Sequence, residues 1–396
     1  MKRQKGFSLL ELMVSMVIVV AVVATAIGAL IQAEHATQAV AFEANTQENL
    51  RAGMHFMVRD LMQAGEGIPQ GGISIPYAVA TSSLNRPGTS APVSTKFPTA
   101  YTTLPAITPG WQAGSLATSI NPATNAVLTG IRTDMINILY ADNILQDTAN
   151  NYLYSYPIRQ DSPAVPDCNN GNAAAISATG ATVTLDPACF IMPGKTNPIT
   201  VGNLIMFHNQ NGTALEYVTS VAGQVISFGA GDPAGLNQTG DAFGTVAQLA
   251  TTPGVFPPTT ITRVWMVTYY INVTNALDPQ LIRQVNYPNY PAGGAANPPQ
   301  TIADDIENLA FSYDITSSTD PAGTYTLGPG NAQQPILPDT PAQIRAVNVF
   351  LAGRSEQVYK ATYTPQYLRN NLSTQVSIRS LSFTNQFNTS SSSTTP

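Results

Sequence analysis

A carboxylate inside an apolar stretch is the first feature of this chain that suggests chemistry. Glu11 is the only charged residue between Phe7 and Ala33. A charged side chain in hydrocarbon costs a few kcal/mol unless it is paired, so such residues usually have a function. Gly6 lies just before the apolar run, and cleavage after it would free an α-amino group on Phe7, one helical turn from Glu11. The same amine on a neighbouring copy of the chain could meet the Glu11 carboxylate in the hydrocarbon.

The apolar run has the length and flanking charge of a membrane anchor. The twenty residues from 12 to 31 carry no charge, about what a helix needs to cross a bilayer core. The positive charges of Lys2, Arg3 and Lys5 predict that the N-terminus stays in the cytoplasm while the rest is exported. A secretory signal has its cleavage site after a shorter apolar region, whereas Gly6 lies before this one. The alternative, an uncleaved anchor, explains neither this glycine nor the intramembrane carboxylate.

The N-terminus resembles the class III leader of type IV prepilins and of the related type II secretion pseudopilins. The resemblance rests on the run Lys5-Gly6-Phe7-Ser8-Leu9-Leu10-Glu11-Leu12-Met13. It implies cleavage between Gly6 and Phe7 by a prepilin peptidase, N-methylation of Phe7, and a contact of Glu11 that helps to dock the subunit into a filament. Residues 1–6 would then be the leader, and residues 7–33 the transmembrane half of an N-terminal helix.

We expect this helix to continue as one element to about Gly65, with residues 34–66 forming its periplasmic half. Apolar side chains recur there at helical spacing on one face, for packing against a sheet. They are Leu50, Met54, Met57, Val58 and Leu61. His55 lies on another face between two arginines, and we interpret it as solvated or paired rather than catalytic.

The end of the predicted helix resembles that of PilW-like minor pilins. The matching runs are Gln47-Glu48-Asn49-Leu50-Arg51, Arg59-Asp60-Leu61 and Ala64-Gly65, and J-type minor pseudopilins share the Arg-Asp-Leu part. Two later segments, 302–314 and 344–355, resemble the later half of PilW-like proteins, chiefly as patterned strands.

The composition indicates an exported, turn-rich β protein. Only 10% of the 396 residues are charged, and the chain holds 30 Pro and 29 Gly. The net charge is −6, and loss of the leader would remove three positive charges, so no nucleic-acid-binding surface is indicated. The fold class that we expect is α+β, with the long N-terminal helix packed on a large antiparallel β-rich region.

The chain after the helix divides by composition. Residues 67–130 are rich in Pro, Ser and Thr, and we expect a surface insertion with short strands or a flexible linker. Trp111 in this segment could be an exposed contact or a buried anchor. Residues 131–387 should form the β-rich globular region, as one domain or two. Residues 388–396 should be a disordered tail.

Alternating and aromatic-rich runs predict the strands of the globular region. We expect them at 135–140, 181–185, 204–207, 215–221, 225–228, 263–273, 280–285, 343–351 and 374–383. The stretch 209–212 predicts a hairpin loop. The stretch 302–314 predicts a short helical turn that enters a strand.

Two cysteines, Cys168 and Cys189, would close a ring of 22 residues. In an oxidising compartment a disulfide between them would contribute roughly 3 kcal/mol by constraining the unfolded chain. Metal binding is the weaker interpretation, because two thiols without a nearby His are too few ligands for a structural zinc.

Two groups of acidic and amide residues are candidate ligand sites. Asp232, Asn237 and Asp241 form an oxygen-rich loop that could hold calcium, although their spacing is not that of an EF-hand and such clusters are mostly turns. The other group consists of Asp304, Asp305 and Glu307, which we interpret as a solvated helix start.

No catalytic motif accompanies these groups. The three histidines are His35, His55 and His208, and no nucleophile, phosphate-binding or metalloprotease pattern surrounds a Ser, Cys or Gly run. We therefore expect no enzyme, no cofactor and no metal.

The resemblance implies a minor pilin of a type IV pilus that helps to initiate assembly at a tip complex. Its partners would be other minor and major pilins, the prepilin peptidase, the inner-membrane assembly platform and possible tip adhesins. It would wait in the bacterial inner membrane with its globular part in the periplasm. The alternatives are a J-type minor pseudopilin of type II secretion and a pilus-tip adhesive protein.

Overall fold

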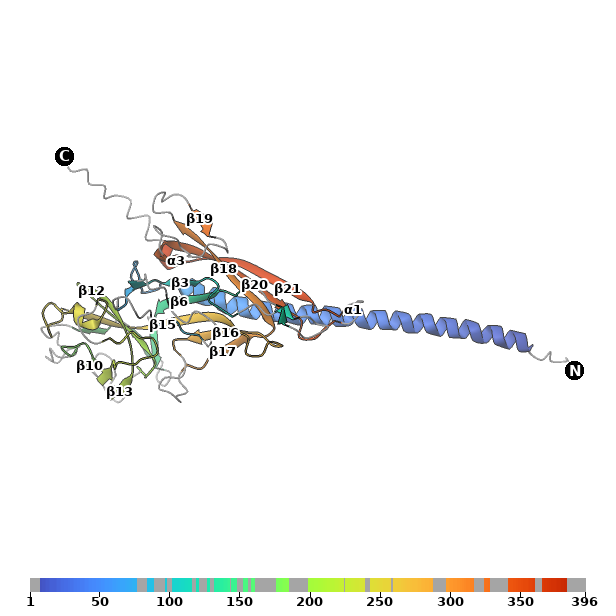
Figure 1. Cartoon of the computed structure of the whole chain (residues 1–396), viewed down its shortest axis with the longest axis horizontal. Coiled ribbons are helices and arrows are strands. Elements are labelled where there is room, and N and C mark those ends of the chain that lie inside the picture. Colours follow the sequence, from blue (N-terminus) through green and yellow to red (C-terminus); the bar gives the residue numbers. More distant parts are fainter. Residues whose placement is uncertain are drawn as a thin grey trace, which may run out of the picture.

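The computed structural model shows a long N-terminal helix packed on antiparallel β-sheet (Figure 1), which confirms the predicted α+β class. The structure describes residues 8–76, 84–88, 97, 102–115, 119–120, 127–128, 132–142, 144–147, 152–155, 158–160, 176–184, 199–223, 225–238, 243–257, 259–287, 297–316, 324–327, 341–359 and 365–382. Gly6, Phe7, Cys168, Cys189 and the segment 388–396 lie outside the described residues, so the cleavage, the disulfide and the tail stay predictions.

One helix, α1, runs without interruption from Leu9 to Gln63, a length of 55 residues. At about 1.5 Å per residue it is roughly 80 Å long. It projects from the globular body, with the N-terminus at its far end (Figure 1). The helix ends close to the predicted position, and Gly65 and Gly67 follow it with φ angles of 77° and 68°, in the left-handed region that favours glycine.

The predicted apolar stripe packs the second half of α1 on the sheets. Its buried members are Leu50, Met54, Met57 and Leu61, and Val58 is partly buried against the same core. His55 lies on another face and is exposed, as predicted. The helix lies close to the sheet at Gly53, where a Cβ atom would lie 2.8 Å from Cδ2 of Leu281. A larger side chain at this position would require the Leu281 side chain to shift.

The largest sheet has eight strands and is built on the long strand β15. Its strands are β3 (Ile107–Gly110), β6 (Met135–Ala141), β9 (Ile158–Gln160), β11 (Leu204–Asn209), β12 (Gly212–Tyr217), β15 (Thr259–Asn272), β16 (Gln280–Val285) and β17 (Gln300–Ala303). β15 pairs antiparallel with β6, β9, β11 and β16. β11 and β12 form a hairpin whose last pair is Asn209 and Gly212, which confirms the hairpin predicted there.

A four-stranded antiparallel sheet completes the support for the helix. Its order is β19 (Thr324–Leu327), β18 (Ile306–Thr316), β20 (Ile344–Arg354) and β21 (Arg369–Ser377). Asp134, just before β6, joins this sheet to the larger one. Its backbone N–H donates to the Leu309 carbonyl at 2.9 Å, and its carboxylate accepts the Phe311 N–H at 2.9 Å. Side chains of α1 and of both sheets share one core.

The predicted helical turn at 302–314 is wrong. This segment consists of β17, a bend at Asp304 and Asp305, and β18. Asp305 has a φ angle of 57°, in the left-handed region that Asp tolerates better than most residues, so the chain turns sharply between two strands instead of forming a helical turn. The strand predicted at 374–383 is also too long, because β21 ends at Ser377.

The remaining described elements are short. They are β1 (Ile73–Ser74), β2 (Thr103–Leu104), β4 (Ser119–Ile120), β5 (Val127–Leu128), β7 (Ile144–Asp147), β8 (Tyr152–Ser155), β10 (Thr182–Thr184), β13 (Ser220–Ala222), β14 (Val225–Ser227), the 3-10 helices η1 (Val246–Leu249) and η2 (Pro341–Gln343), and α3 (Arg379–Ser382). β10, β14 and β13 form a small sheet of their own, and its side chains share a core cluster with Phe207 of β11 and with Phe228.

Candidate functional site

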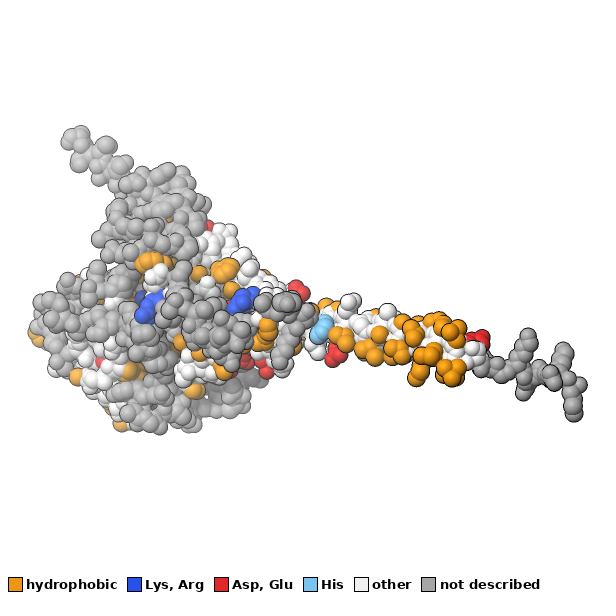
Figure 2. All heavy atoms as spheres, turned by 45° about the vertical axis from the view of Figure 1, so that its right-hand side comes forward, with side chains coloured by type: hydrophobic (Ala, Val, Ile, Leu, Met, Phe, Trp, Pro, Cys, Tyr) orange, Lys and Arg blue, Asp and Glu red, His pale blue; other side chains and the backbone are white. Residues whose placement is uncertain are grey.

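The first half of α1 is an apolar surface that the rest of the described chain leaves uncovered. Its large apolar side chains from Leu9 to Ile31 are between 47% and 78% exposed. Figure 2 shows these hydrophobic side chains covering the projecting part of the helix. By length and composition, α1 is able to cross a membrane. An apolar surface of this extent requires lipid or other apolar helices around it.

Glu11 lies in the first turn of α1 at the outer end of this surface. The backbone N–H groups of Glu11 and Leu12 both donate to the Ser8 carbonyl, at 3.0 and 3.1 Å. Ser8 is the N-cap residue, and its side chain makes no capping hydrogen bond. Among the described residues, the exposed Glu11 carboxylate has no hydrogen bond or ion pair. A carboxylate in a first turn is favoured by the helix dipole, and this one is free to meet a further cation.

A family model described as the prokaryotic N-terminal methylation motif matches residues 1–28. The chain has a prepilin-type N-terminus. The match covers the leader, Gly6, Phe7, Glu11 and most of the apolar run, and it supports a type IV pilin-like protein. Comparisons with curated proteins and with solved structures gave no significant match. The prepilin-type N-terminus implies pilin partners and processing by a prepilin peptidase in general, and a membrane-anchoring role for α1.

A buried ion pair fixes the second half of α1 to the larger sheet. Asp60 of α1 is fully buried, and its Oδ2 accepts hydrogen bonds from Tyr269 Oη and Arg283 Nε, both at 2.6 Å. Burial opposes the charge of Arg283, but the hydrogen bond and charge of Asp60 raise the pKa of this guanidinium overall. Burial and the neighbouring Asp60 raise the pKa of Tyr269 and bring that of Tyr140 to about 12, so both phenols stay protonated.

One weak signal of this ion pair is present in the sequence. Asp60 stands between Arg59 and Leu61 in the run that resembles minor pilins, within a stripe that is otherwise apolar. A carboxylate at the end of an apolar stripe indicates a polar partner, but Arg283 lies too far along the chain for local spacing to identify it. The register of β15 with β16, in which Tyr269 lies opposite Arg283, brings the two partners of Asp60 together.

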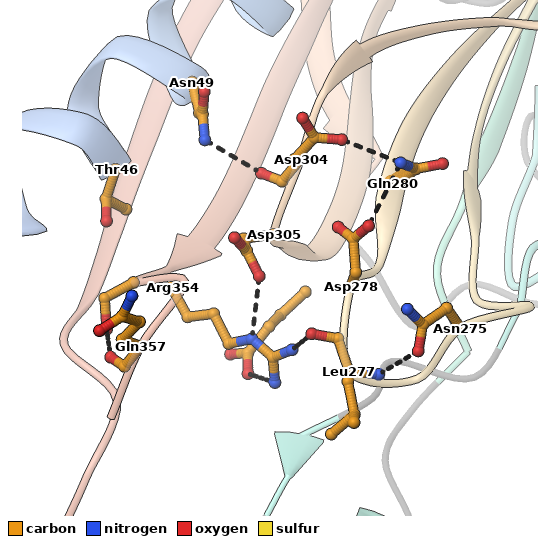
Figure 3. Close-up of polar contacts among 12 residues, drawn as sticks. Thr46, Asn49, Asn275, Leu277, Asp278, Gln280, Asp304, Asp305, Arg354 and Gln357 are labelled. Atoms are coloured by element: carbon orange, nitrogen blue, oxygen red, sulfur yellow. Dashed lines mark hydrogen bonds and ion pairs between the residues drawn. The ribbon is translucent and has the colours of Figure 1, made fainter. Parts of the chain in front are cut away.

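A second charged cluster lies beside α1 at the bend before β18 (Figure 3). The Arg354 side chain is fully buried, and its Nη2 donates to the Leu277 carbonyl at 2.6 Å. Its Nε lies 3.5 Å from Asp305, and its Nη1 lies 3.6 Å from Glu307. The guanidinium also lies 4.5 Å from the centre of the Tyr367 ring. A single buried cation is thus surrounded by two carboxylates, a carbonyl and an aromatic face.

This cluster corrects the prediction of a solvated helix start. Asp305 and Glu307 are 6% and 8% exposed and lie beside the buried Arg354, because the segment turns into β18 instead of opening a helix. Glu307 also accepts a hydrogen bond from Arg369 Nε at 2.7 Å. Asp304 alone faces solvent, and its backbone carbonyl accepts the Asn49 side-chain amide of α1 at 3.5 Å (Figure 3). The cluster therefore also touches the helix near the point where α1 leaves the body.

The Asp305 carboxylate gives this cluster a pH dependence of definite sign. Burial raises the pKa of Asp305 to about 6, while the charge of Arg354 opposes this. The folded state thus binds the proton more tightly than an unfolded chain, in which the pKa is about 3.9, and the stability contribution of Asp305 decreases as the pH rises from about 4 to about 6.

In the variant Asp305→Asn this decrease in stability should be absent. The wild-type Tm minus the variant Tm should therefore be larger at about pH 4.5 than at about pH 7, and a difference independent of pH would contradict this.

The oxygen-rich loop that is a candidate calcium site forms a hydrogen-bonded turn over its described residues, 232–238. The Asp232 carboxylate accepts the backbone N–H groups of Ala234, Leu236 and Asn237, at 3.0 to 3.1 Å. The Asn237 amide donates to the Tyr217 carbonyl at 2.7 Å. Asp241, the third predicted ligand, lies outside the described residues. The Asp232 carboxylate therefore stabilises the turn, and the Asn237 side chain attaches the loop to β12.

The histidines occupy separate places. His35 of α1 packs edge-on against Tyr359, with ring centres 6.5 Å apart. His55 and His208 are both exposed. Among the described parts of the chain, no three His, Cys, Asp or Glu side chains are grouped as metal ligands.

Proposed function

We propose that this protein is a minor pilin of a type IV pilus, of the PilW-like kind. The observation that carries the proposal is the continuous helix α1. Its outer half bears a prepilin motif and an unpaired Glu11, and its inner half is fixed in a large β-rich body. The outer half could thus be surrounded by lipid and later by the helices of other subunits, while the body stays the same.

The proposed path starts at the inner membrane. A prepilin peptidase cleaves between Gly6 and Phe7, Phe7 is N-methylated, and the body waits in the periplasm. Packing of apolar helices then supplies the association energy in the filament, and Glu11 sets the register by pairing with the α-amine of a neighbouring subunit. The large body places the subunit at the tip of a priming complex with other minor pilins, where it helps to start assembly.

We further propose the division of the chain that its composition suggests. Residues 1–6 are the leader, 7–33 and 34–66 are the two halves of the helix, and 67–130 are an insertion that contributes β3 to the largest sheet. Residues 131–387 are the β-rich body, and 388–396 a tail. A disulfide between Cys168 and Cys189 belongs to the same proposal, since the body would fold in an oxidising compartment.

The mass of the mature protein tests the processing step. In native membranes that contain the prepilin peptidase, the chain should begin at N-methylated Phe7, and without the peptidase it should begin at Met1. Gly6→Leu should remain uncleaved even with the peptidase present. Gly28→Ala is a matched control, because nothing lies within 4 Å of the added Cβ, and it should be processed normally. A wild-type chain that begins at Met1 in both strains would refute the prepilin pathway.

The deletion phenotype tests the choice of filament, because type II secretion pseudopilins share the motif. Loss of the protein should abolish pili and twitching motility while secretion of folded exoproteins continues. The opposite result would assign the chain to a secretion pseudopilus.

A further inference from the structure

An open groove of about 850 Å³ lies on the face of the four-stranded sheet that points away from α1. Strands β18, β20 and β21 form its floor, and Trp111 and Gln112, which follow β3, form part of its wall. We infer that this groove, here called the outer groove, binds a neutral carbohydrate. The inference goes beyond the proposed role in filament assembly and rests on the side chains that line the groove.

The two faces of these three strands have different chemistry. Leu309, Phe311, Val349, Leu351 and Val376 point into the core that α1 shares. The alternate residues point outward because side chains along a strand alternate between faces. The strand register aligns them in rows, of which two are Ala310–Phe350–Ser373 and Ser312–Asn348–Gln375. Apart from Ala310, the side chains of these two outward rows are amides, hydroxyls and an aromatic ring, and they lie outside the core clusters of the described residues.

These side chains match the chemistry of a sugar. A sugar ring has an apolar C–H face and a rim of hydroxyl groups, each of which donates and accepts hydrogen bonds. The partly exposed rings of Trp111 and Phe350 supply flat apolar surfaces. Gln112, Asn308 and Gln375 supply amides, which also both donate and accept. Few precisely placed polar groups on an apolar surface are the usual composition of a small-ligand site.

Two amide side chains that line the groove, Asn348 and Gln375, are held in a fixed orientation. The side-chain nitrogens of Asn348 and Gln375 donate to the two carboxylate oxygens of Asp314, at 3.1 and 2.5 Å. Their carbonyl oxygens are thus directed away from Asp314 and are suited to accept ligand hydroxyl groups. Side chains that are already ordered lose less entropy when a ligand binds, so this arrangement is favourable for binding.

Charge and backbone pairing disfavour other ligands. Arg132 and Asp134 are the only charged residues that line the described groove, and the Asp134 carboxylate is occupied by the N–H groups of Gln112 and Phe311. One cation is too few for a nucleic acid. A peptide strand added within the floor would need free backbone groups, but β20 is paired on both sides, with β18 and with the edge strand β21.

The groove is open in the setting proposed for this protein. Because α1 packs on the opposite face of the same strands, helices gathered around α1 would leave the outer groove exposed. The exposure of the groove in a filament rests on the proposed function, but sugar binding to the groove does not. The binding experiment can therefore fail or succeed independently of prepilin processing.

Trp111 allows binding to be measured directly on the full-length protein. The chain has two tryptophans, and Trp265→Phe leaves Trp111 as the only one. This variant, in a detergent without a sugar headgroup, is titrated with lactose, maltose, cellobiose and diacetylchitobiose. At least one sugar should shift the Trp111 fluorescence with a Kd between about 1 µM and 1 mM. No saturable change with any of them up to about 50 mM would overturn the inference.

Matched variants locate the binding site, with affinity followed by calorimetry. Trp111→Ala and Gln375→Ala should each weaken binding by about tenfold or more, because each removes a ligand contact at the floor or wall. Ser377→Ala changes the same face of β21 one row beyond the groove, and its affinity should equal that of the wild type. If all three variants lost sugar affinity equally, or if none lost any, the sugar would bind outside the groove. Saturable binding of unrelated peptides instead of sugars would also refute a carbohydrate site.

Discussion

Arg283→Met should lower the free energy of unfolding by about 3–5 kcal/mol, the typical cost of leaving a buried charge without its partner. Asp60 has only 1% of its side chain exposed, and in the variant it would keep the Tyr269 hydroxyl but no cation from the sheet. The loss can be measured by urea unfolding of the full-length protein in detergent, followed by near-UV circular dichroism. We expect the midpoint to shift while the m-value stays constant.

Two further variants separate the ion pair from general damage. Asp60→Leu combined with Arg283→Met should recover part of the stability, because no buried charge is left unpaired, while the buried Tyr269 hydroxyl loses its acceptor. Arg59→Met removes the other arginine near Asp60, at 3.5 Å, but its side chain is 50% exposed. That variant should lose at most about 1 kcal/mol. Additive losses in the double variant would mean that Asp60 and Arg283 do not stabilise each other.

Glu11→Gln should lower incorporation of the subunit into filaments by about tenfold or more, since a neutral amide cannot pair with an α-amine in hydrocarbon. The fold of the body should not change, because an acid in the first turn contributes only about 0.3–1 kcal/mol to helix stability. The measurement is the amount of protein in the sheared filament fraction relative to the amount in the membrane.

Glu34→Gln is the matched control for this prediction. Glu34 is also an exposed glutamate of α1, but it lies just beyond the apolar run, where water screens its charge. Its incorporation should equal that of the wild type. Equal incorporation of Glu11→Gln would show that apolar packing alone sets the register of the helix.

The long helix could be predicted from the sequence because its signals are local. The apolar run, the stripe from Leu50 to Leu61 and the glycines after Gln63 each lie within a few residues of the feature that they determine. The hairpin at 209–212 was predicted for the same reason, since turn residues separate two strand-like runs. The type and position of a helix or strand can be predicted from such patterns wherever the apolar residues follow one period, helical or strand-like.

The two buried charged clusters could not be predicted in this way. Arg283 lies 223 residues from Asp60, and Arg354 lies 77 residues from Leu277, so only the sheet register brings them together. At Asp304 and Asp305, the acidic residues suggested a helix start. Acidic residues also occur at sharp turns between two strands, where one residue has a left-handed backbone conformation. In the folded protein the acidic side chains at this turn are buried beside arginine.

The outer groove also depends on partners from different segments. Trp111 was expected to be either an exposed contact or a buried anchor, and the sequence offers no signal that the outward rows of β18, β20 and β21 lie beside it. Outward-facing Asn, Gln and Ser residues are common on strands. They form a groove only where another segment of the chain lies next to them.

The continuity of α1 has a mechanical consequence. A pull on its outer end passes along one helix axis without a hinge, because no proline interrupts Leu9–Gln63. β21 runs alongside the inner half of the helix (Figure 1), so the load would act as shear between the two. The buried stripe and the bond of Asp60 to Arg283 would carry this load in parallel. Many contacts would have to fail at once before the body separated from the helix, which suits a subunit under tension.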